Sequence, residues 1–297
     1  MGKSILLSKE LCSETIDVGV KKGVKTSFYQ TLILSILAGA FISLGAFTST
    51  VGSYGIESYG LSKLVAGLLF PIGLVLILIC GGELFTGNIL LIQAYMERKL
   101  SLVRFIRNLI IVYVGNFIGA FLIALLLFLS GILLNDDALL GAYAIKVAYY
   151  KGSLTFINLL ASGILCNLLV CLAVWGSYAA KDMAGKILII WVTIMAFITS
   201  GFEHCIANMY YFSIGLLAKL DSRILGASTL TSEKINEVNI GSALGNIIPV
   251  TIGNIIGGLV FVGLAYWVVY IHIPRINENK QNSRISRKKD IAEEKRA

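Results

Sequence analysis

The feature that most constrains this sequence is a series of six long apolar segments. They cover residues 28–51, 64–95, 102–134, 154–180, 187–217 and 240–273. A run of about 20 apolar residues is long enough to cross a bilayer as a helix. Hydrophobic residues fill 57% of the 297 positions and charged residues only 14%, which is not typical of a soluble domain. The sequence therefore predicts an all-α polytopic membrane protein with six transmembrane helices.

The second and fifth segments are each interrupted by polar residues near the middle. The first interruption reads C-G-G-E-L-F-T-G-N from Cys80, and the second reads G-F-E-H-C-I-A-N from Gly201. As one straight helix, the longer of these segments would measure about 48 Å, against a hydrocarbon core of about 30 Å. We expect two half-helices in each segment, because broken backbone inside a membrane is tolerated only when it is buried in protein or lines an aqueous cavity.

The two halves of the chain resemble each other. Each interruption holds a glutamate and an asparagine five residues apart, Glu83 with Asn88 and Glu203 with Asn208. The third segment contains V-Y-V-G-N-F-I-G and the sixth contains V-T-I-G-N-I-I-G, whose Gly-x-x-x-Gly spacing allows close helix contact. Three spans followed by three equivalent spans have opposite orientations, because three is odd. We predict two inverted three-helix repeats, with helices 2 and 5 broken and a transport site between the halves.

The two ends of the chain are rich in positive charge. Residues 1–26 lack the apolar core of a signal peptide and are expected to form an amphipathic cytoplasmic segment. Residues 27–273 form the six-span domain, and residues 274–297 are expected to be a basic, disordered cytoplasmic tail. With both termini inside, 19 of the 25 lysines and arginines lie on the cytoplasmic side, as the positive-inside rule requires.

Several other classes of protein fit the sequence poorly. The net charge of +8 is explained by topology, and no nucleic-acid-binding motif accompanies it. The five cysteines form no C-x-x-C pair, so neither a disulfide framework nor a zinc site is expected. An intramembrane hydrolase would lack a recognisable nucleophile motif, and haem binding normally needs paired axial ligands. We expect no metal, no cofactor and no catalytic residue.

The polar residues of the interruptions suggest how a solute would pass. Half-helices whose N-termini point inward bring N–H groups and partial positive charge to the centre, which favours an anion. His204 can donate a hydrogen bond or a proton near neutral pH, and the Thr86 hydroxyl can donate and accept. Lys151 is predicted to belong to a positive funnel, with a solvated loop charge as the alternative, and Asn167 to add a polar contact.

The glutamates and the bulky residues each have two interpretations. Glu83 and Glu203 either line the path or, as we favour, support the helix breaks with Asn88 and Asn208 by accepting hydrogen bonds from freed N–H groups. Bulky apolar side chains beside a polar site either pack the core or form narrow gates. The candidates for gates are Phe70, Leu74, Leu84, Phe85 and Phe197.

These motifs, together with K-G-S-L-T-F from Lys151 and G-I-L-C-N-L-L-V-C-L-A-V-W from Gly163, resemble the formate/nitrite transporter family over nearly the whole apolar chain. The resemblance implies an aquaporin-like protomer and a homopentamer in which each protomer has its own path. It implies that His204 is the central pore histidine, that Thr86 faces it, and that Lys151 and Asn167 are further polar pore residues. The five bulky residues become candidates for two constrictions.

Within the family, the sequence around Cys205 is most similar to the hydrosulfide channel branch of anaerobic bacteria. We therefore expect a channel or proton-linked carrier for small monovalent anions in the bacterial cytoplasmic membrane. Hydrosulfide is favoured, and formate and nitrite are further candidate substrates. The alternatives are a formate or nitrite transporter proper and an aquaporin-like channel for neutral solutes.

Overall fold

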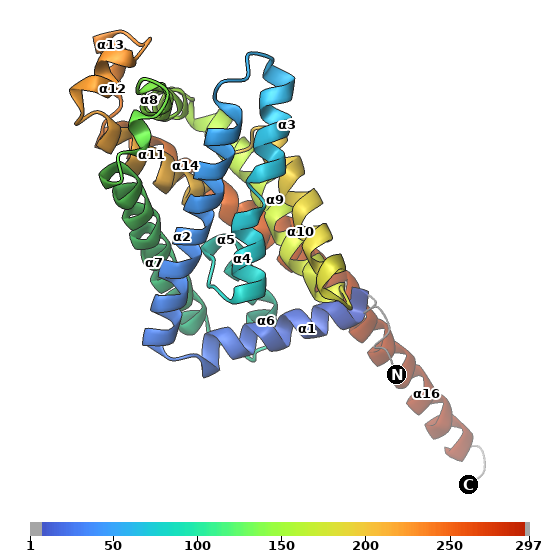
Figure 1. Ribbon diagram of the computed structural model, residues 1–297. Helices are drawn as coiled ribbons and strands as arrows, with labels where there is room; N and C mark the ends of the chain where they lie inside the picture. Colours follow the sequence, from blue (N-terminus) through green and yellow to red (C-terminus); the bar gives the residue numbers. More distant parts are fainter. Residues whose placement is uncertain (1–7, 295–297) are drawn as a thin grey trace.

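The computed structural model describes residues 8–294, which form a bundle of helices with no strand in that range (Figure 1). The helices are α1 (Ser8–Val20), α2 (Phe28–Ser53), α3 (Tyr59–Leu69), α4 (Ile72–Cys80), α5 (Phe85–Asn88), α6 (Ile92–Met96), α7 (Leu102–Leu129), α8 (Leu139–Gly152), α9 (Phe156–Ala179), α10 (Met183–Thr199), α11 (Cys205–Ala218), α12 (Ser222–Ala227), α13 (Ser232–Glu237), α14 (Ile240–Gly258), α15 (Ala265–Trp267) and α16 (Ile273–Glu294). Short 3₁₀ turns cover Ile89–Leu91 and Ile132–Leu134, and π-helical turns cover Lys21–Lys25, Leu259–Leu264 and Val268–His272.

Five stretches of the described chain are long and apolar enough to cross a membrane. They are Phe28–Ser53, Tyr59–Cys80, Leu102–Leu129, Phe156–Ala179 and Ile240–Ile285. The apolar helices α10 and α11 are shorter, at 17 and 14 residues. The expected fifth segment is therefore a pair of helices, and the second segment likewise passes from α4 through non-helical residues into α5 and α6.

Most of the long helices begin at a polar residue whose side chain accepts a backbone N–H of the first turn. Such a cap satisfies one of the N–H groups that have no partner within the helix. The caps are Ser27 for α2, Ser101 for α7, Thr155 for α9, Asp182 for α10 and Asn239 for α14. These short polar residues in an apolar sequence set where the helices start.

Both expected interruptions break their helices, and each break contains a glycine in the left-handed region. The first break, residues 81–84, begins at Gly81 with φ of 98°, and the second, residues 200–204, contains Gly201 with φ of 75°. Glycine adopts positive φ without the steric cost that a Cβ imposes. The two glycines therefore allow the chain to leave one half-helix and enter the next inside the bundle.

Close helix pairs hold the broken helices in place, and glycines of the two Gly-x-x-x-Gly motifs form their contacts. A Cβ on Gly119 of α7 would collide with the carbonyl of Ile36 on α2. A Cβ on Gly257 of α14 would collide with the carbonyl of Ile164 on α9. The close approach expected from the motif is present in both pairs, because backbone meets backbone where the side chain is missing.

Replacing Gly257 with alanine is expected to lower the free energy of unfolding by about 1–3 kcal/mol, because α14 must move away from α9. The matched control is Gly245→Ala on the same helix, where an added Cβ would meet nothing within 4 Å. That control should be neutral or slightly stabilising, since alanine has the higher helix propensity. Denaturation in mixed detergent micelles measures both variants, and equal stabilities would contradict the proposed contact.

Helices α1 and α16 lie at the same end of the bundle (Figure 1). Helix α1 crosses that end and buries Leu11, Cys12 and Ile16 while its charged residues stay exposed. Residues 1–7 of the predicted N-terminal segment lie outside the described residues.

The chain after Pro274 continues as helix α16 through Glu294, where we predicted disorder. This stretch contains no glycine and many good helix formers.

Glu97 connects the loop after α6 to helices α15 and α16 through hydrogen bonds. Its carboxylate accepts hydrogen bonds from the Trp267 indole at 2.8 Å and from the Arg275 guanidinium at 2.7 Å. The hydrogen bond from Arg275 lowers the pKa of the Glu97 carboxyl. Because the pKa of Glu97 is lower in the folded protein, this contact stabilises the fold at pH values above the ordinary carboxyl pKa. The stabilisation is lost as the pH falls through the lowered pKa of Glu97.

Candidate functional site

The two breaks meet at a hydrogen bond between His204 and Thr86. The Thr86 hydroxyl lies 2.9 Å from Nε2 of His204, and both side chains are buried. The backbone N–H of Ala207 donates to Nδ1 of the same ring at 3.2 Å, so His204 is the N-cap of α11. Because Nδ1 uses its lone pair as an acceptor, the proton of the neutral ring is on Nε2 and is donated to Thr86. The Thr86 hydroxyl then has its own hydrogen free to donate.

Asn254 of α14 satisfies the backbone of the second break. Its Oδ1 accepts the N–H of Cys205 at 2.9 Å, and its Nδ2 donates to the carbonyls of Glu203 at 3.0 Å and Gly163 at 2.8 Å. All these contacts are buried. One amide side chain therefore joins α14, α9 and the break, and it provides the partners that the interrupted helix cannot supply.

Asn116 of α7 makes the same set of contacts at the first break. Its Oδ1 accepts the N–H of Phe85 at 2.9 Å, and its Nδ2 donates to the carbonyls of Glu83 at 2.8 Å and Ser35 at 2.7 Å. Neither asparagine was among the predicted site residues. Both stand inside the G-N-x-I-G motifs that we used only for their glycines. The signal available in the sequence was an asparagine at the same position of both motifs, within an apolar segment.

The glutamates have partners other than the freed N–H groups that we expected. Glu203 accepts Lys151 Nζ at 2.8 Å and Asn208 Nδ2 at 2.6 Å, and Asn208 also donates to Asn246 at 2.7 Å. Both Glu203 and the lysine are largely removed from solvent, with side-chain exposures of 7% and 17%. The Lys151 charge is therefore held in a buried ion pair, which differs both from a free funnel charge and from a solvated loop charge.

An equivalent cluster lies beside the first break. Glu83 is 3.1 Å from Lys22 Nζ and accepts Asn88 Nδ2 at 2.6 Å, and Asn88 also donates to Asn108 at 2.9 Å. Lys22 donates in addition to Asn88 Oδ1 at 2.9 Å. Each break is thus fixed by a glutamate, an asparagine five residues later, a lysine from another element and a further asparagine. The sequence identified two of the four groups in the first cluster and three of the four in the second, where Lys151 was expected in another role.

Asn167 of α9 contacts the first break at the level of Thr86. Its Nδ2 donates to the carbonyls of Asn254 at 2.6 Å and Thr86 at 3.3 Å, and its buried Oδ1 has no hydrogen-bond partner. The Cys171 thiol also donates to the Thr86 carbonyl, at 3.3 Å. The structure therefore places Asn167 next to the threonine of the central pair and gives it a role in holding that residue.

The five bulky residues predicted near the site are all buried, and two of them, Phe197 and Phe85, are next to a member of the central pair. The rings of Phe70 and Phe197 meet edge to face with centroids 5.7 Å apart. Phe197 lies 6.1 Å from the His204 ring, measured between centroids. Phe85 precedes Thr86 and packs against Tyr113 at 4.8 Å. Leu74 and Leu84 belong to the same apolar core.

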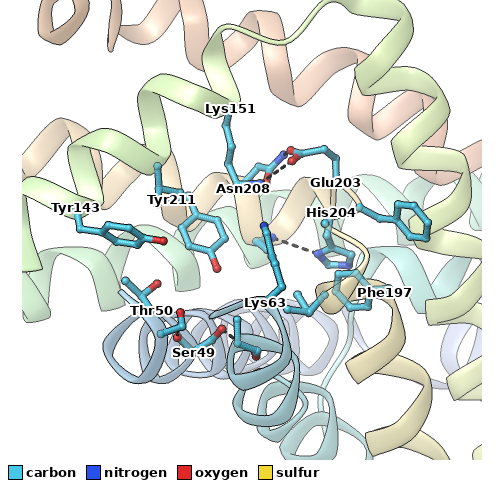
Figure 2. Close-up of a pocket in the computed structure, with 17 residues that line it drawn as sticks. Ser49, Thr50, Lys63, Tyr143, Lys151, Phe197, Glu203, His204, Asn208 and Tyr211 are labelled. Carbon is cyan, nitrogen blue, oxygen red and sulfur yellow. Dashed lines mark hydrogen bonds and ion pairs between the residues drawn. The ribbon is translucent and has the colours of Figure 1, made fainter. Parts of the chain in front are cut away.

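A cavity of about 140 Å³ reaches His204 from one side, and we call it the His204 cavity (Figure 2). Its lining includes His204, Phe197, Lys63, Lys151, Thr50 and Tyr211. On the side of the first break, a much smaller space of about 20 Å³ is lined by Lys22, Arg104, Arg107 and Asn108 among others. Both spaces have cationic side chains in their walls. Among the described residues, no group of three or more His, Cys, Asp or Glu side chains is placed to hold a metal ion.

This architecture defines the class of the protein. Apolar helices of membrane-spanning length enclose two broken helices, and a polar pair lies where the breaks meet, as in a multi-pass membrane transport protein. The chain belongs to the formate/nitrite transporter family, whose sequence profile, described as "Formate/nitrite transporter", matches residues 9–268. The family is one of transporters and channels, not of enzymes.

Individual relatives cover most of the chain. This chain is 37% identical over 273 residues to the formate channel FocA of Escherichia coli strain K12, and the alignment covers 90% of this chain and 95% of that protein. It is 40% identical over 267 residues to the uncharacterised transporter YrhG of Bacillus subtilis strain 168, with 88% and 92% covered. The solved structure of a pentameric formate channel with formate bound superposes with a TM-score of 0.75 at 33% identity, covering 84% of this chain and 99% of that one.

Proposed function

We propose that this protein is a membrane channel for small monovalent anions, with formate as its main substrate. The observation that carries the proposal is the buried His204–Thr86 pair, placed where two half-helices begin and at the end of a cavity with cationic walls. Formate is favoured over hydrosulfide because FocA and the solved pentameric channel are both described as formate channels. The likeness around Cys205, which favoured hydrosulfide, has no comparable support, and nitrite stays a second candidate.

The geometry of the pair suggests hydrogen bonding as the means by which an anion passes. A bare anion entering an apolar constriction loses its water shell at a large free-energy cost. Formate has two oxygens: one would replace the Thr86 hydroxyl as the acceptor of the His204 Nε2–H, and the other would accept the hydrogen of the Thr86 hydroxyl. Protonation of the ring at Nδ1 would break the hydrogen bond from Ala207, so the neutral imidazole is the favoured donor. No proton has to move from protein to substrate in this scheme.

We further propose the finer architecture. The matching contacts of Asn116 with Asn254, and of Glu83 with Glu203, support two inverted three-helix repeats with the central pair between them. The likeness to a solved formate channel that is pentameric supports a homopentamer. The concentration of basic residues at both ends supports cytoplasmic termini in a bacterial plasma membrane. Phe70 with Phe197 is assigned to one constriction, and Leu74, Leu84 and Phe85 to the other.

Removing the Thr86 hydroxyl tests the site. Thr86→Val is expected to reduce formate flux into liposomes about tenfold or more, because a hydrogen bond to a charged partner contributes about 1.5–3 kcal/mol. Thr86→Ser keeps the hydroxyl and should retain most of the flux. Unchanged flux in the double variant His204→Ala with Thr86→Ala would contradict the proposed site.

The substrate class is tested with the wild-type protein. Uptake of formate, nitrite, hydrosulfide and chloride is compared side by side, and osmotic swelling in glycerol detects passage of neutral solutes. We expect formate to pass fastest and glycerol to be excluded. Rapid swelling in glycerol would instead favour the aquaporin-like alternative, and a clear preference for hydrosulfide would restore the interpretation based on Cys205.

A further inference from the structure

Lys63 is the second lysine of the His204 cavity, and its charge is balanced differently from that of Lys151. Lys151 is bound to Glu203 at 2.8 Å. Lys63 takes part in none of the ion pairs found among residues 8–294. Its ammonium group lies 5.7 Å from the centroid of the Tyr59 ring. The cavity therefore contains one neutralised lysine and one lysine without a carboxylate partner.

Lys63 lies beside the second break. A Cβ built on Gly201 would have the Lys63 ammonium as its nearest neighbour, at 3.7 Å. Gly201 stands three residues before His204, so the ammonium lies beside the segment that carries the central histidine. Figure 2 shows the Lys63 side chain rising from α3 into the space between Tyr211 and His204. The Lys63 side chain is therefore part of the cavity wall, where a solute that enters the cavity can contact it.

Hydroxyl groups lie in the wall of the same cavity. Tyr143 and Tyr211 line it together with Lys63, and Figure 2 draws their oxygens on the side of the cavity away from His204, whereas the nearby Thr50 hydroxyl already donates to the Ala46 carbonyl at 2.9 Å. A hydroxyl donates one hydrogen bond and an ammonium donates three. An anion with two acceptor oxygens can therefore use the lysine and a hydroxyl at the same time, whereas chloride or hydrosulfide gains mainly from the charge.

We propose that Lys63 forms a receiving site for small oxyanions of the carboxylate type in the His204 cavity, ahead of the His204–Thr86 pair. This inference rests on the proposed function, because the order in which an anion meets Lys63 and then the central pair presupposes transport. Binding of the anion at Lys63 does not itself require transport. Lys63 supplies the attraction that Lys151 cannot, because Glu203 already neutralises Lys151. A charge at the entrance speeds the capture of an anion, and added salt weakens this effect by screening the charge.

The test compares the full-length protein with Lys63→Gln, Lys63→Arg and Lys146→Gln in liposomes. Lys146 lies on α8, whose residues Tyr143, Val147 and Lys151 line the cavity, but Lys146 itself does not, so its replacement removes the same charge from a neighbouring position. We expect Lys63→Gln to raise the half-saturating formate concentration about fivefold, close to 1 kcal/mol, with maximal flux much less affected. The salt dependence of uptake at low formate should weaken in this variant alone. Lys63→Arg and Lys146→Gln should behave like the wild type.

A binding measurement separates this inference from the proposed function. Formate is added to each detergent-solubilised protein, and the shift in melting temperature is recorded after gel filtration has shown wild-type elution. Formate should stabilise the wild type and Lys146→Gln, and stabilise Lys63→Gln much less. If the wild type transports no formate but shows this pattern, the proposed function fails and the Lys63 site stands. If Lys63→Gln matches the wild type in uptake and stabilisation, or Lys146→Gln has the same effect as Lys63→Gln, the inference is overturned.

Discussion

Replacing Asn254 with leucine is expected to lower the free energy of unfolding by at least about 3 kcal/mol. The substitution keeps the side-chain volume similar but removes the hydrogen-bond partners of three buried backbone groups, on Cys205, Glu203 and Gly163. Each buried group left unsatisfied costs about 1–3 kcal/mol. Inside a membrane, water cannot easily replace the lost partner. The variant should therefore yield little folded protein, and what is recovered should unfold in detergent at a much lower temperature.

Two further substitutions make this expectation specific. Asn116→Leu removes the equivalent contacts at the first break and should have an effect of similar size. Asn158→Leu is the control, because this side chain is exposed near the start of α9 and no break depends on it. If Asn254→Leu were as stable as the Asn158 variant, the backbone of the second break would have to find other partners, and the asparagine would not be what holds it.

The sequence was sufficient to locate the breaks because their signals are local. A glutamate and a histidine inside an apolar segment, with a glycine close by, are visible within a few residues of one another. The same is true of Thr86, which follows Glu83 closely and does meet His204. The partners of the breaks are not local. Asn116 and Asn254 stand 31 and 49 residues from the N–H groups that they accept, so only the packing of α7 and α14 brings them into place.

Charge assignments were the least predictable part of the site. Lys151 is predicted from sequence as a funnel charge or a solvated one, because nothing local indicates that Glu203, 52 residues away, neutralises it. Lys63 carries no local signal at all, since a lysine near the end of an apolar segment normally extends to the membrane surface. Its orientation toward Gly201 depends on how α3 and α10 pack. Which lysine is free is therefore a property of the tertiary structure.

Replacing Lys151 with methionine is expected to lower the free energy of unfolding by about 3–5 kcal/mol, because it leaves the buried Glu203 carboxylate without its cation. Methionine keeps the apolar part of the side chain and removes the ammonium group, which also lies 5.1 Å from the centroid of the Tyr211 ring. The loss therefore reports the charge and not the packing. A chemical denaturation series in mixed micelles measures it.

A second substitution in the same protein decides whether the ion pair is the cause. Adding Glu203→Gln to Lys151→Met removes the unpaired charge and keeps one carbonyl oxygen for Asn208, so most of the lost stability should return. Arg223→Met is the matched control: its ion pair with Asp221 is 2.6 Å long, but the arginine side chain is 67% exposed, and the free energy of unfolding should hardly change. If the double variant is no more stable than Lys151→Met alone, Lys151 stabilises the second break through its other contacts. If it recovers, the pair fixes the segment that carries His204 and is neutral overall, which leaves Lys63 as the lysine of the cavity whose charge an entering anion meets.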